Sequence, residues 1–313
     1  MSTATDGELF AHPALFYRGE EQYTAGTVPF VRAGLAAGEA VAVAVPGPRL
    51  ELIRTGLGSS AAGVRFLDMT EVGRNPGRII PGVLRAFADA HADSGRVRIV
   101  GEPIWPGRTA VEYPACVQHE ALINSAFGDR EVTILCPYDA DRLEPQVLAD
   151  AHVTHPVVID GIDADAQLPS PTYDPQRAIA RYNEPLPHPP GAASISFDAG
   201  ELPKSRYFAV QEAERLGLAG LRLQDLTLAV AELTTNSVLH GGGSGTLRIW
   251  AEDERIVCEV RDHGRLTDPL AGRRPPSRDQ PGGRGLLLVH YVADLVRVHT
   301  APDGTTIRFY LAR

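Results

Sequence analysis

The first half of the chain alternates short apolar runs with longer stretches of helical periodicity. Valine- and isoleucine-rich runs indicate strands, and the segments between them indicate helices. The strands are expected at residues 40–45, 64–68, 97–100 and 132–136, and the helices at 24–37, 49–57, 77–92 and 110–127. Runs that are apolar throughout are typical of strands buried on both faces. The pattern therefore predicts an α/β domain, a parallel sheet with helices on both faces.

A proline-rich stretch ends this pattern. Residues 168–190 read LPSPTYDPQRAIARYNEPLPHPP. Proline at this density sustains neither a helix interior nor a central strand, so we expect a semi-extended linker with one or two helical turns at 176–182. A length of 313 residues also favours two domains. The predicted organisation is a first domain over 7–165, a linker over 166–191 and a second domain over 192–313.

The second half has a different pattern. Two helices are expected at 202–216 and 223–240, and a third at 284–293. Strands are expected at 194–197, 246–251, 255–261, 296–300 and 305–311, with a hairpin turn at Asp303-Gly304. Helices that are segregated from a mostly antiparallel sheet predict an α+β sandwich.

Composition narrows the range of partners and locations. The net charge is −9 with no compensating basic cluster, which argues against a direct nucleic-acid partner. The three cysteines are far apart and form no CxxC pair, which argues against a disulfide framework or a structural zinc site. The N-terminus has no secretory pattern, and the longest apolar run, residues 40–45, is too short to span a bilayer. A cytoplasmic protein without a membrane span is expected.

Two side chains of the helix AELTTNSVLH suggest chemistry. Glu232 and Asn236 lie one turn apart on one stripe of this helix. A carboxylate and an amide so placed can share a hydrated magnesium ion and a water molecule. Taken alone, the pair is more simply explained as a solvated helix face.

Further along the chain, polar and glycine-rich elements follow in a definite order. Asp262 ends a strand and Gly264 follows it, an arrangement in which a carboxylate can accept a hydrogen bond from an amine such as that of adenine. A polar, proline-rich stretch leads to Gly282, Gly283 and Gly285, which open an apolar helix where phosphate can bind. Each element alone is as well explained by an ordinary turn or loop-to-helix junction.

Taken together, these elements resemble the N, G1, G2 and G3 boxes of the GHKL ATPase superfamily over residues 194–311. The resemblance implies a two-layer Bergerat sandwich that binds ATP and Mg²⁺. It implies that Glu232 is the general base, that Asn236 holds Mg²⁺, and that residues 267–281 form a lid over ATP. The nucleotide-binding residues that it implies are Asn236, Asp262, Gly264, Gly282, Gly283, Arg284, Gly285, Leu286 and either Thr305 or Thr306.

Within this superfamily, LAVAELTTNSVLHGGG and RGLLLVHYVADLV resemble the anti-sigma-factor serine kinases of the actinobacterial type. The resemblance implies two protein partners, a sigma factor and a small antagonist that is phosphorylated on serine, and a second copy of the chain is a candidate partner. Two alternatives stay open. One is an ATP-binding anti-sigma factor without kinase activity, and the other is an atypical sensor histidine kinase.

The first half resembles the MEDS-type sensory domain, a degenerate relative of RecA-like ATPases. The likeness rests on HPALFYRGEEQY, VGEPIW, YPACVQHEALIN and CPYD. VPGPRLEL stands where an active relative has its phosphate loop, so we expect no nucleotide hydrolysis here. A sensory pocket for an unknown signal is expected at the strand ends, lined by Glu102, Trp105, His119 and Glu120. Cys116 beside the last two suggests a metal, but the spacing matches no standard site, and a polar helix face explains these residues as well.

Overall fold

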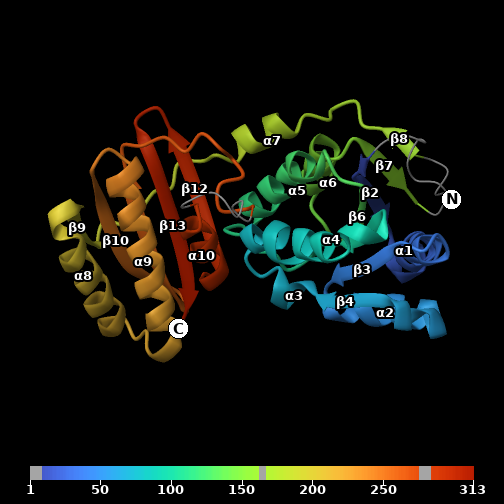
Figure 1. Cartoon of the computed structure of the whole chain (residues 1–313), viewed down its shortest axis with the longest axis horizontal. Coiled ribbons are helices and arrows are strands. Elements are labelled where there is room, and N and C mark those ends of the chain that lie inside the picture. Colours follow the sequence, from blue (N-terminus) through green and yellow to red (C-terminus); the bar gives the residue numbers. More distant parts are fainter. Residues whose placement is uncertain (1–8, 162–166, 275–282) are drawn as a thin grey trace. The chain divides into compact units, whose positions relative to one another are not determined.

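The chain folds into two units whose boundary falls inside the proline-rich segment. The computed structural model describes residues 9–161, 167–274 and 283–313 (Figure 1). The units are Met1–Tyr182 and Asn183–Arg313. Among the described residues, no helix is both long enough and apolar enough to cross a membrane.

The sheet of the N-terminal unit is built from the apolar runs of the first half. Its strand order is β4-β3-β5-β6-β2-β7-β8, with β1 beside β6, and all pairs are parallel except β7 with β8. Strands β1, β2, β7 and β8 are not among the predicted ones, and β2, which opens with a proline, pairs with both β6 and β7. The strands are β1 Phe10–Ala11, β2 Pro13–Tyr17, β3 Ala40–Val45, β4 Val64–Asp68, β5 Val97–Gly101, β6 Val132–Asp139, β7 Val157–Asp160 and β8 Gln167–Pro169.

Helices cover both faces of this sheet, which confirms the predicted α/β class. Apolar residues of β2, β3 and β6, among them Leu135, pack with α1 and α2. The next residue, Cys136, points to the opposite face and contacts α5. The helical stretch predicted at 77–92 is present but is not one regular α-helix, because Ile80–Arg85 form a π-helix between a 3-10 turn, Pro76–Arg78, and α4. The α-helices are α1 Gly19–Ala36, α2 Gly47–Leu57, α3 Met69–Val72, α4 Ala86–Ala90, α5 Tyr113–Phe127, α6 Pro145–Thr154 and α7 Pro175–Arg181.

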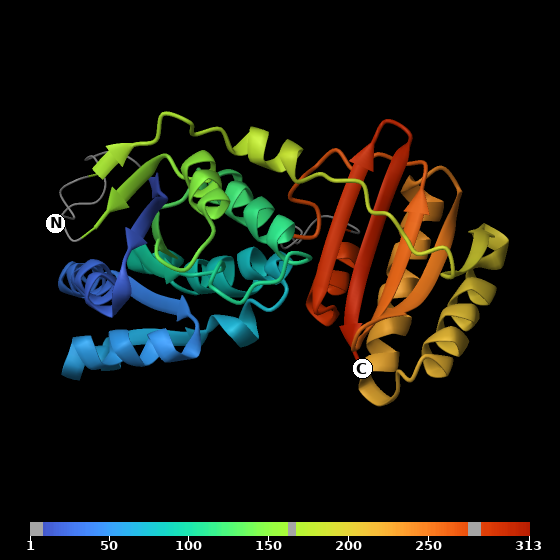
Figure 2. The ribbon, with the colours of Figure 1, turned by 180° about the vertical axis from the view of Figure 1, so that it is seen from behind.

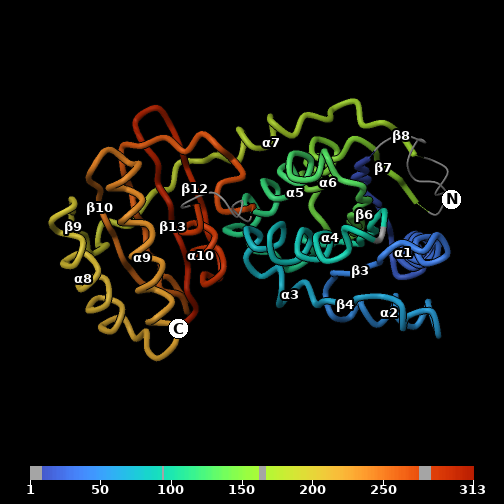
Figure 3. The backbone as a smooth tube through the Cα atoms, viewed as in Figure 1, coloured from blue at the N-terminus to red at the C-terminus, as the bar shows by residue number. Residues whose placement is uncertain are grey.

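The C-terminal unit is an antiparallel sheet with helices on one face, as predicted. The strand order is β12-β13-β11-β10-β9, and the tube in Figure 3 follows the chain from α9 into β10. Apolar residues of α8, α9 and α10 share one core with alternate residues of the strands. The elements are β9 Ala193–Asp198, α8 Leu202–Arg215, α9 Gly220–His240, β10 Ser244–Glu252, β11 Arg255–Asp262, α10 Gly285–Val292, β12 Leu295–Ala301 and β13 Gly304–Ala312.

The end of the proline-rich segment crosses the outer face of this second sheet (Figure 2). Asn183 Nδ2 donates to the Thr300 carbonyl oxygen at 2.8 Å. Arg308 donates to the Leu186 carbonyl oxygen at 2.9 Å and pairs with the buried Glu259. Residues 183–187 are therefore docked on the sheet, although the sequence predicts only an extended linker for them.

Candidate functional site

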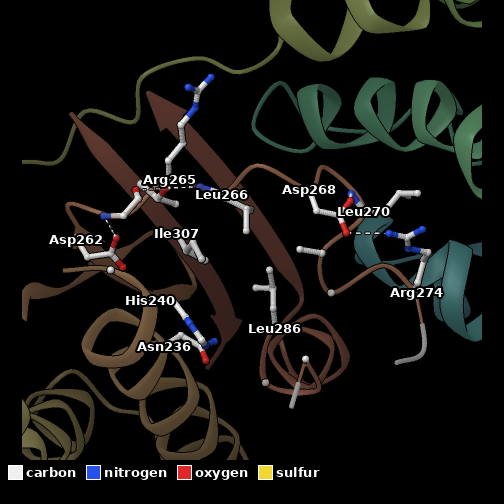
Figure 4. Close-up of a pocket in the computed structure, with 17 residues that line it drawn as sticks. Asn236, His240, Asp262, Arg265, Leu266, Asp268, Leu270, Arg274, Leu286 and Ile307 are labelled. Atoms are coloured by element: carbon white, nitrogen blue, oxygen red, sulfur yellow. Dashed lines mark hydrogen bonds and ion pairs between the residues drawn. The ribbon is translucent and has the colours of Figure 1, made fainter. Parts of the chain in front are cut away.

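A cavity of about 620 Å³ lies where α9, α10 and the ends of β11 and β13 meet (Figure 4). It gathers Asn236 of α9, Asp262 of β11, Gly285 of α10 and Thr305 of β13. These residues are far apart in the sequence, and all four belong to the predicted nucleotide site. The fold thus brings the helical, strand-end and glycine-rich elements of that prediction to one cavity.

Asp262 is held in a fixed orientation at the end of β11. Ser237 Oγ donates to its Oδ2 at 2.6 Å, and the Gly264 backbone N–H donates to its Oδ1 at 2.9 Å. An ionised carboxylate has about four acceptor positions, so two stay available to a ligand. A half-buried carboxylate that only accepts hydrogen bonds suits an exocyclic amine such as that of adenine.

Close packing around Asp262 requires glycine at two positions. Gly304 has a φ of 144°, and a Cβ added there would lie 2.1 Å from the Asp262 carbonyl oxygen. A Cβ added at Gly264 would lie 2.6 Å from the carbonyl oxygen of His240, the last residue of α9. The turn after β11 therefore runs directly against the end of α9, which places the carboxylate beside the helix.

Glu232 and Asn236 face the first residue of α10. A Cβ added at Gly285 would lie 2.5 Å from Glu232 Oε2 and 3.3 Å from Asn236 Nδ2. Asn236 lines the cavity, whereas Glu232 lies behind Gly285 and is not among the lining residues. Both side chains are partly exposed, so a hydrated Mg²⁺ can reach the pair without a large desolvation cost.

The N-terminus of α10 opens on the cavity. Gly283, with a φ of 80°, lines the cavity together with Gly285 and Leu286, and Arg284 is the exposed N-cap residue. The first N–H groups of a helix have no partner within the helix, and its dipole favours a negative ligand there. Gly282 and residues 275–281 of the predicted lid lie outside the described residues.

The described part of the predicted lid, residues 267–274, borders the cavity with several side chains. Asp268 and the exposed Arg274 form an ion pair at 2.8 Å. Leu270 is buried, and Gly272 packs so closely that an added Cβ would lie 2.5 Å from Leu286 Cγ. This part of the segment therefore packs against α10 through an apolar contact.

The structure distinguishes the two threonines of β13. Thr305 lines the cavity, donates from Oγ1 to the Gly264 carbonyl oxygen at 2.8 Å, and accepts from the Leu266 backbone N–H at 3.2 Å. Thr306 is the next residue of the strand, so its side chain points to the opposite face of the sheet. Of the two predicted positions, Thr305 is the one that borders the cavity.

Several cavity residues have no signal in the sequence pattern. Arg265 and Ile307 line the cavity, and the Ser237 hydroxyl orients Asp262. His240 also lines the cavity, but it lies on the same stripe of α9 as Glu232 and Asn236, which the sequence does indicate. Ser237 directly follows Asn236, and only the packing of α9 against β11 shows that its hydroxyl reaches the carboxylate.

The predicted sensory residues of the N-terminal unit have different partners. Glu102, fully buried, accepts from Tyr23 at 3.3 Å and pairs with Arg49 at 3.1 Å. Burial raises the pKa of Glu102 to about 8, and the Arg49 charge opposes this rise. The ring of Trp105 is covered by the Arg108 guanidinium, 3.9 Å from the ring centre.

His119 and Glu120 are both buried on α5. The Glu120 carboxylate lies among His12, Cys136 and His155. Its polar neighbours are thus different from those of Glu102.

Comparison with known families agrees with both halves of the sequence analysis. Residues 11–156 match the MEDS family, described as the methanogen/methylotroph, DcmR sensory domain. Residues 195–311 match the histidine kinase-like ATPase domain. The chain therefore combines a MEDS domain with a GHKL-like ATPase domain, and the second match implies that the C-terminal unit binds ATP.

Individual relatives and solved structures each match part of the chain. A serine-protein kinase RsbW from Halalkalibacterium halodurans is 32% identical over 98 residues, which cover 28% of this chain and 60% of that kinase. The RsbU and RsbW domains of a Mycobacterium tuberculosis protein match with a TM-score of 0.30 and 17% identity, over 41% of this chain and 33% of that one. The Acinetobacter baumannii histidine kinase AdeS matches with a TM-score of 0.24 and 10% identity, over 38% of this chain and 67% of that one.

Proposed function

We propose that this protein is a cytoplasmic regulator of transcription that binds Mg·ATP in its C-terminal unit, restrains a sigma factor and phosphorylates a serine of an antagonist protein. The MEDS domain would receive the signal. The observation that carries the proposal is the single cavity that joins Asn236, Asp262 and the start of α10, with Glu232 directly behind Gly285. The similarity to a serine-protein kinase supports the choice of reaction.

Each side chain of the site has a separate role in this proposal. Asp262 accepts a hydrogen bond from the adenine amine, and the backbone N–H groups at the start of α10 donate to phosphate oxygens. Asn236 would hold Mg²⁺, which would neutralise charge on the phosphates. Glu232 accepts the proton of the serine hydroxyl. The serine oxygen then bonds to the terminal phosphorus of ATP as the bond between that phosphorus and the ADP oxygen breaks.

The same residues weigh against the two alternatives. A module that only binds ATP has no need of a carboxylate beside Asn236, whereas Glu232 lies there with its Oε2 next to Gly285. A histidine kinase needs an exposed phosphoacceptor histidine on a helix before the ATPase domain. Between α7 and β9 the described chain has no helix, and residues 183–187 are docked on the sheet.

Incubation of the full chain with γ-labelled ATP, alone and with candidate antagonists, tests the proposal. We expect acid-stable label on a serine of one antagonist and no label on the chain itself. Label on neither protein would leave the ATP-binding anti-sigma factor, and acid-labile label on the chain would identify a histidine kinase. Direct binding of a sigma factor in the presence and absence of ATP tests restraint independently of the chemistry.

A further inference from the structure

Four side chains of metal-ligand type meet inside the N-terminal unit. His12 precedes β2, Glu120 lies on α5, Cys136 lies on β6, and His155 lies between α6 and β7. None is more than 1% exposed. They come from separate parts of the chain, so the parallel register of β6, β2 and β7 brings them together.

The donor atoms are spaced as in a tetrahedral metal site. His12 Nε2 lies 3.2 Å and His155 Nε2 lies 3.4 Å from Glu120 Oε2. Cys136 Sγ lies 3.4 Å from His12 Nε2 and 3.6 Å from Glu120 Oε2, and all four donors lie within 4.8 Å of one another. Zinc bonds of about 2.0–2.3 Å imply tetrahedral edges of about 3.3–3.8 Å. The four donor-to-donor distances given above are already close to these edges. The donor pairs that lie farther apart, within 4.8 Å, would need to move slightly closer on metal binding.

Hydrogen bonds on the far side of each imidazole direct a lone pair into the cluster. His155 Nδ1 lies 2.9 Å from the Ala151 carbonyl oxygen, which can only accept, so Nδ1 carries the proton. His12 Nδ1 lies 3.2 Å from Asn124 Oδ1. The amide of Asn124 is fixed in this orientation because its Nδ2 donates to the Thr154 carbonyl oxygen at 2.9 Å. Such outer partners are typical of histidines that bind metals.

Without a cation, the cluster is poorly satisfied. With both rings neutral, two nitrogen lone pairs face the Glu120 carboxylate, and the thiol of Cys136 supplies the only proton among the four donors. Glu120 Oε1 is buried and has no hydrogen-bond partner among the described residues. Two imidazolium rings would leave a net positive charge in the protein interior. A single imidazolium ring would neutralise the carboxylate, but the Nε2 lone pair of the other ring would still face Glu120 Oε2. A divalent ion with one thiolate and one carboxylate makes a neutral site, which avoids the cost of an uncompensated buried charge.

We propose that His12, Glu120, Cys136 and His155 bind a divalent transition-metal ion of the zinc type. Binding releases the thiol proton of Cys136 to solvent, and the sulfur coordinates as thiolate. With four protein ligands and no exposed position, the site is of the closed, structural kind. The ion links α5, the β1–β2 region, β6 and the α6–β7 junction, so it stabilises the sheet at its centre.

Metal analysis of the full chain, purified without chelators, tests the site. We expect about one zinc per chain, and after exchange with Co²⁺ a thiolate-to-cobalt charge-transfer band with the visible bands of four-coordinate cobalt. Cys136→Ser should abolish the charge-transfer band. Cys116→Ser, at an equally buried thiol on α5, should keep the band. Asn124→Ala, which frees the His12 ring, should weaken metal affinity about 10- to 100-fold.

The wild-type protein decides the matter even if Cys136→Ser fails to fold. A chain that is folded yet takes up only traces of zinc or cobalt when either is supplied in excess would overturn the proposal. So would a charge-transfer band that survives in folded Cys136→Ser. Another transition metal at one equivalent, lost with the Cys136 thiol, would uphold the site and replace zinc as its occupant.

Discussion

The hydroxyl of Ser237 donates a hydrogen bond to Oδ2 of Asp262 at 2.6 Å. This bond joins helix α9 to the end of strand β11 across the proposed nucleotide site, and the two residues are 25 positions apart in the sequence. Because the Gly264 N–H holds the other oxygen, the carboxylate cannot rotate freely. The direction in which Asp262 presents its free lone pairs is therefore a property of the helix–strand packing.

Asp262→Asn should weaken ATP binding about 10- to 100-fold. The amide presents a donor where the carboxylate presents only acceptors, and a hydrogen bond to a charged group contributes about 1.5–3 kcal/mol. Titration calorimetry with ATP measures the loss. Asp303→Asn is the matched control, because Asp303 is exposed and pairs only with the exposed Arg261 among the described contacts. Unchanged affinity in folded Asp262→Asn would show that the adenine does not bind there.

Ser237→Ala should have a smaller effect of the same kind. One net hydrogen bond contributes about 0.5–1.5 kcal/mol, so we expect ATP affinity to fall about 2- to 12-fold. Ser237→Thr keeps the hydroxyl and should restore most of it. In an Asp262→Asn background, Ser237→Ala should cost little more, since the two side chains act as a unit. Fully additive losses would show that Ser237 does not act through Asp262.

Gly304→Ala should disturb both stability and the site. Its φ of 144° and the 2.1 Å approach to the Asp262 carbonyl oxygen leave no room for a methyl group. Gly243→Ala is the matched control, because Gly243 also has a positive φ, 89°, but open space around it. Backbone strain alone costs about 1–2 kcal/mol. Urea unfolding should show a loss of that size for Gly243→Ala and a clearly larger one for Gly304→Ala, and equal losses would contradict the steric argument.

Periodicity and turn signals predict most of this fold because both domains follow them closely. The apolar run at 40–45 becomes β3 with the same bounds, and Asp303-Gly304 turns the chain from β12 into β13. The central strand β2 escapes prediction, because its short apolar run is defined by pairing with β6 and β7 rather than by its own pattern. The docking of residues 183–187 escapes for a similar reason, since its partners lie on β12 and β13.

The two polar sites differ in how far the sequence predicts them. The order of the ATPase motifs predicts which residues approach the cavity, because each motif sits at the end of a recognisable helix or strand. The four-residue cluster in the N-terminal unit has no such signal. The sequence pairs Glu120 with its neighbours Cys116 and His119, whereas the fold pairs it with His12, Cys136 and His155. Contacts across a parallel sheet leave no fixed spacing along the chain.

The stability of the N-terminal unit should fall as pH rises through the neutral range. The pKa of Glu102 is about 8 in the folded chain, raised by burial from an ordinary value of 4.5. Its protonated form is thus favoured by folding, and the stability it contributes is full below pH 4.5 and lost by about pH 8. One proton contributes a slope of about −1.4 kcal/mol per pH unit in this window.

Glu102→Gln removes that proton exchange while keeping the shape of the side chain. The stability difference between variant and wild type should therefore increase in favour of the variant from pH 5 to 8 and then level off. A Trp250→Phe background leaves Trp105 as the fluorescent reporter of the N-terminal unit during urea unfolding. A difference that is constant over this range would show that Glu102 is ionised in the folded chain at all these pH values.

Glu232 and Asn236 should separate catalysis from binding. Glu232→Ala should leave ATP affinity nearly intact and cut phosphate transfer to an antagonist by about 10²- to 10⁴-fold, the contribution of a positioned general base. Asn236→Ala should weaken Mg²⁺-dependent ATP binding as well as transfer, because it removes a metal ligand. Both positions are partly exposed on α9, so helix stability should change little.

The comparison is made by ATP titration and by transfer of labelled phosphate, with Gln224→Ala as the control on an exposed turn of the same helix. Sigma-factor binding should survive Glu232→Ala if restraint requires only the ATP-loaded shape. The Glu232 carboxylate lies next to Gly285, the first residue of α10. It can therefore accept the hydroxyl proton of a substrate that enters the cavity at the start of α10, and the transfer assay tests this role directly. Equal transfer rates in wild type and Glu232→Ala would remove the kinase assignment and leave an ATP-binding anti-sigma factor.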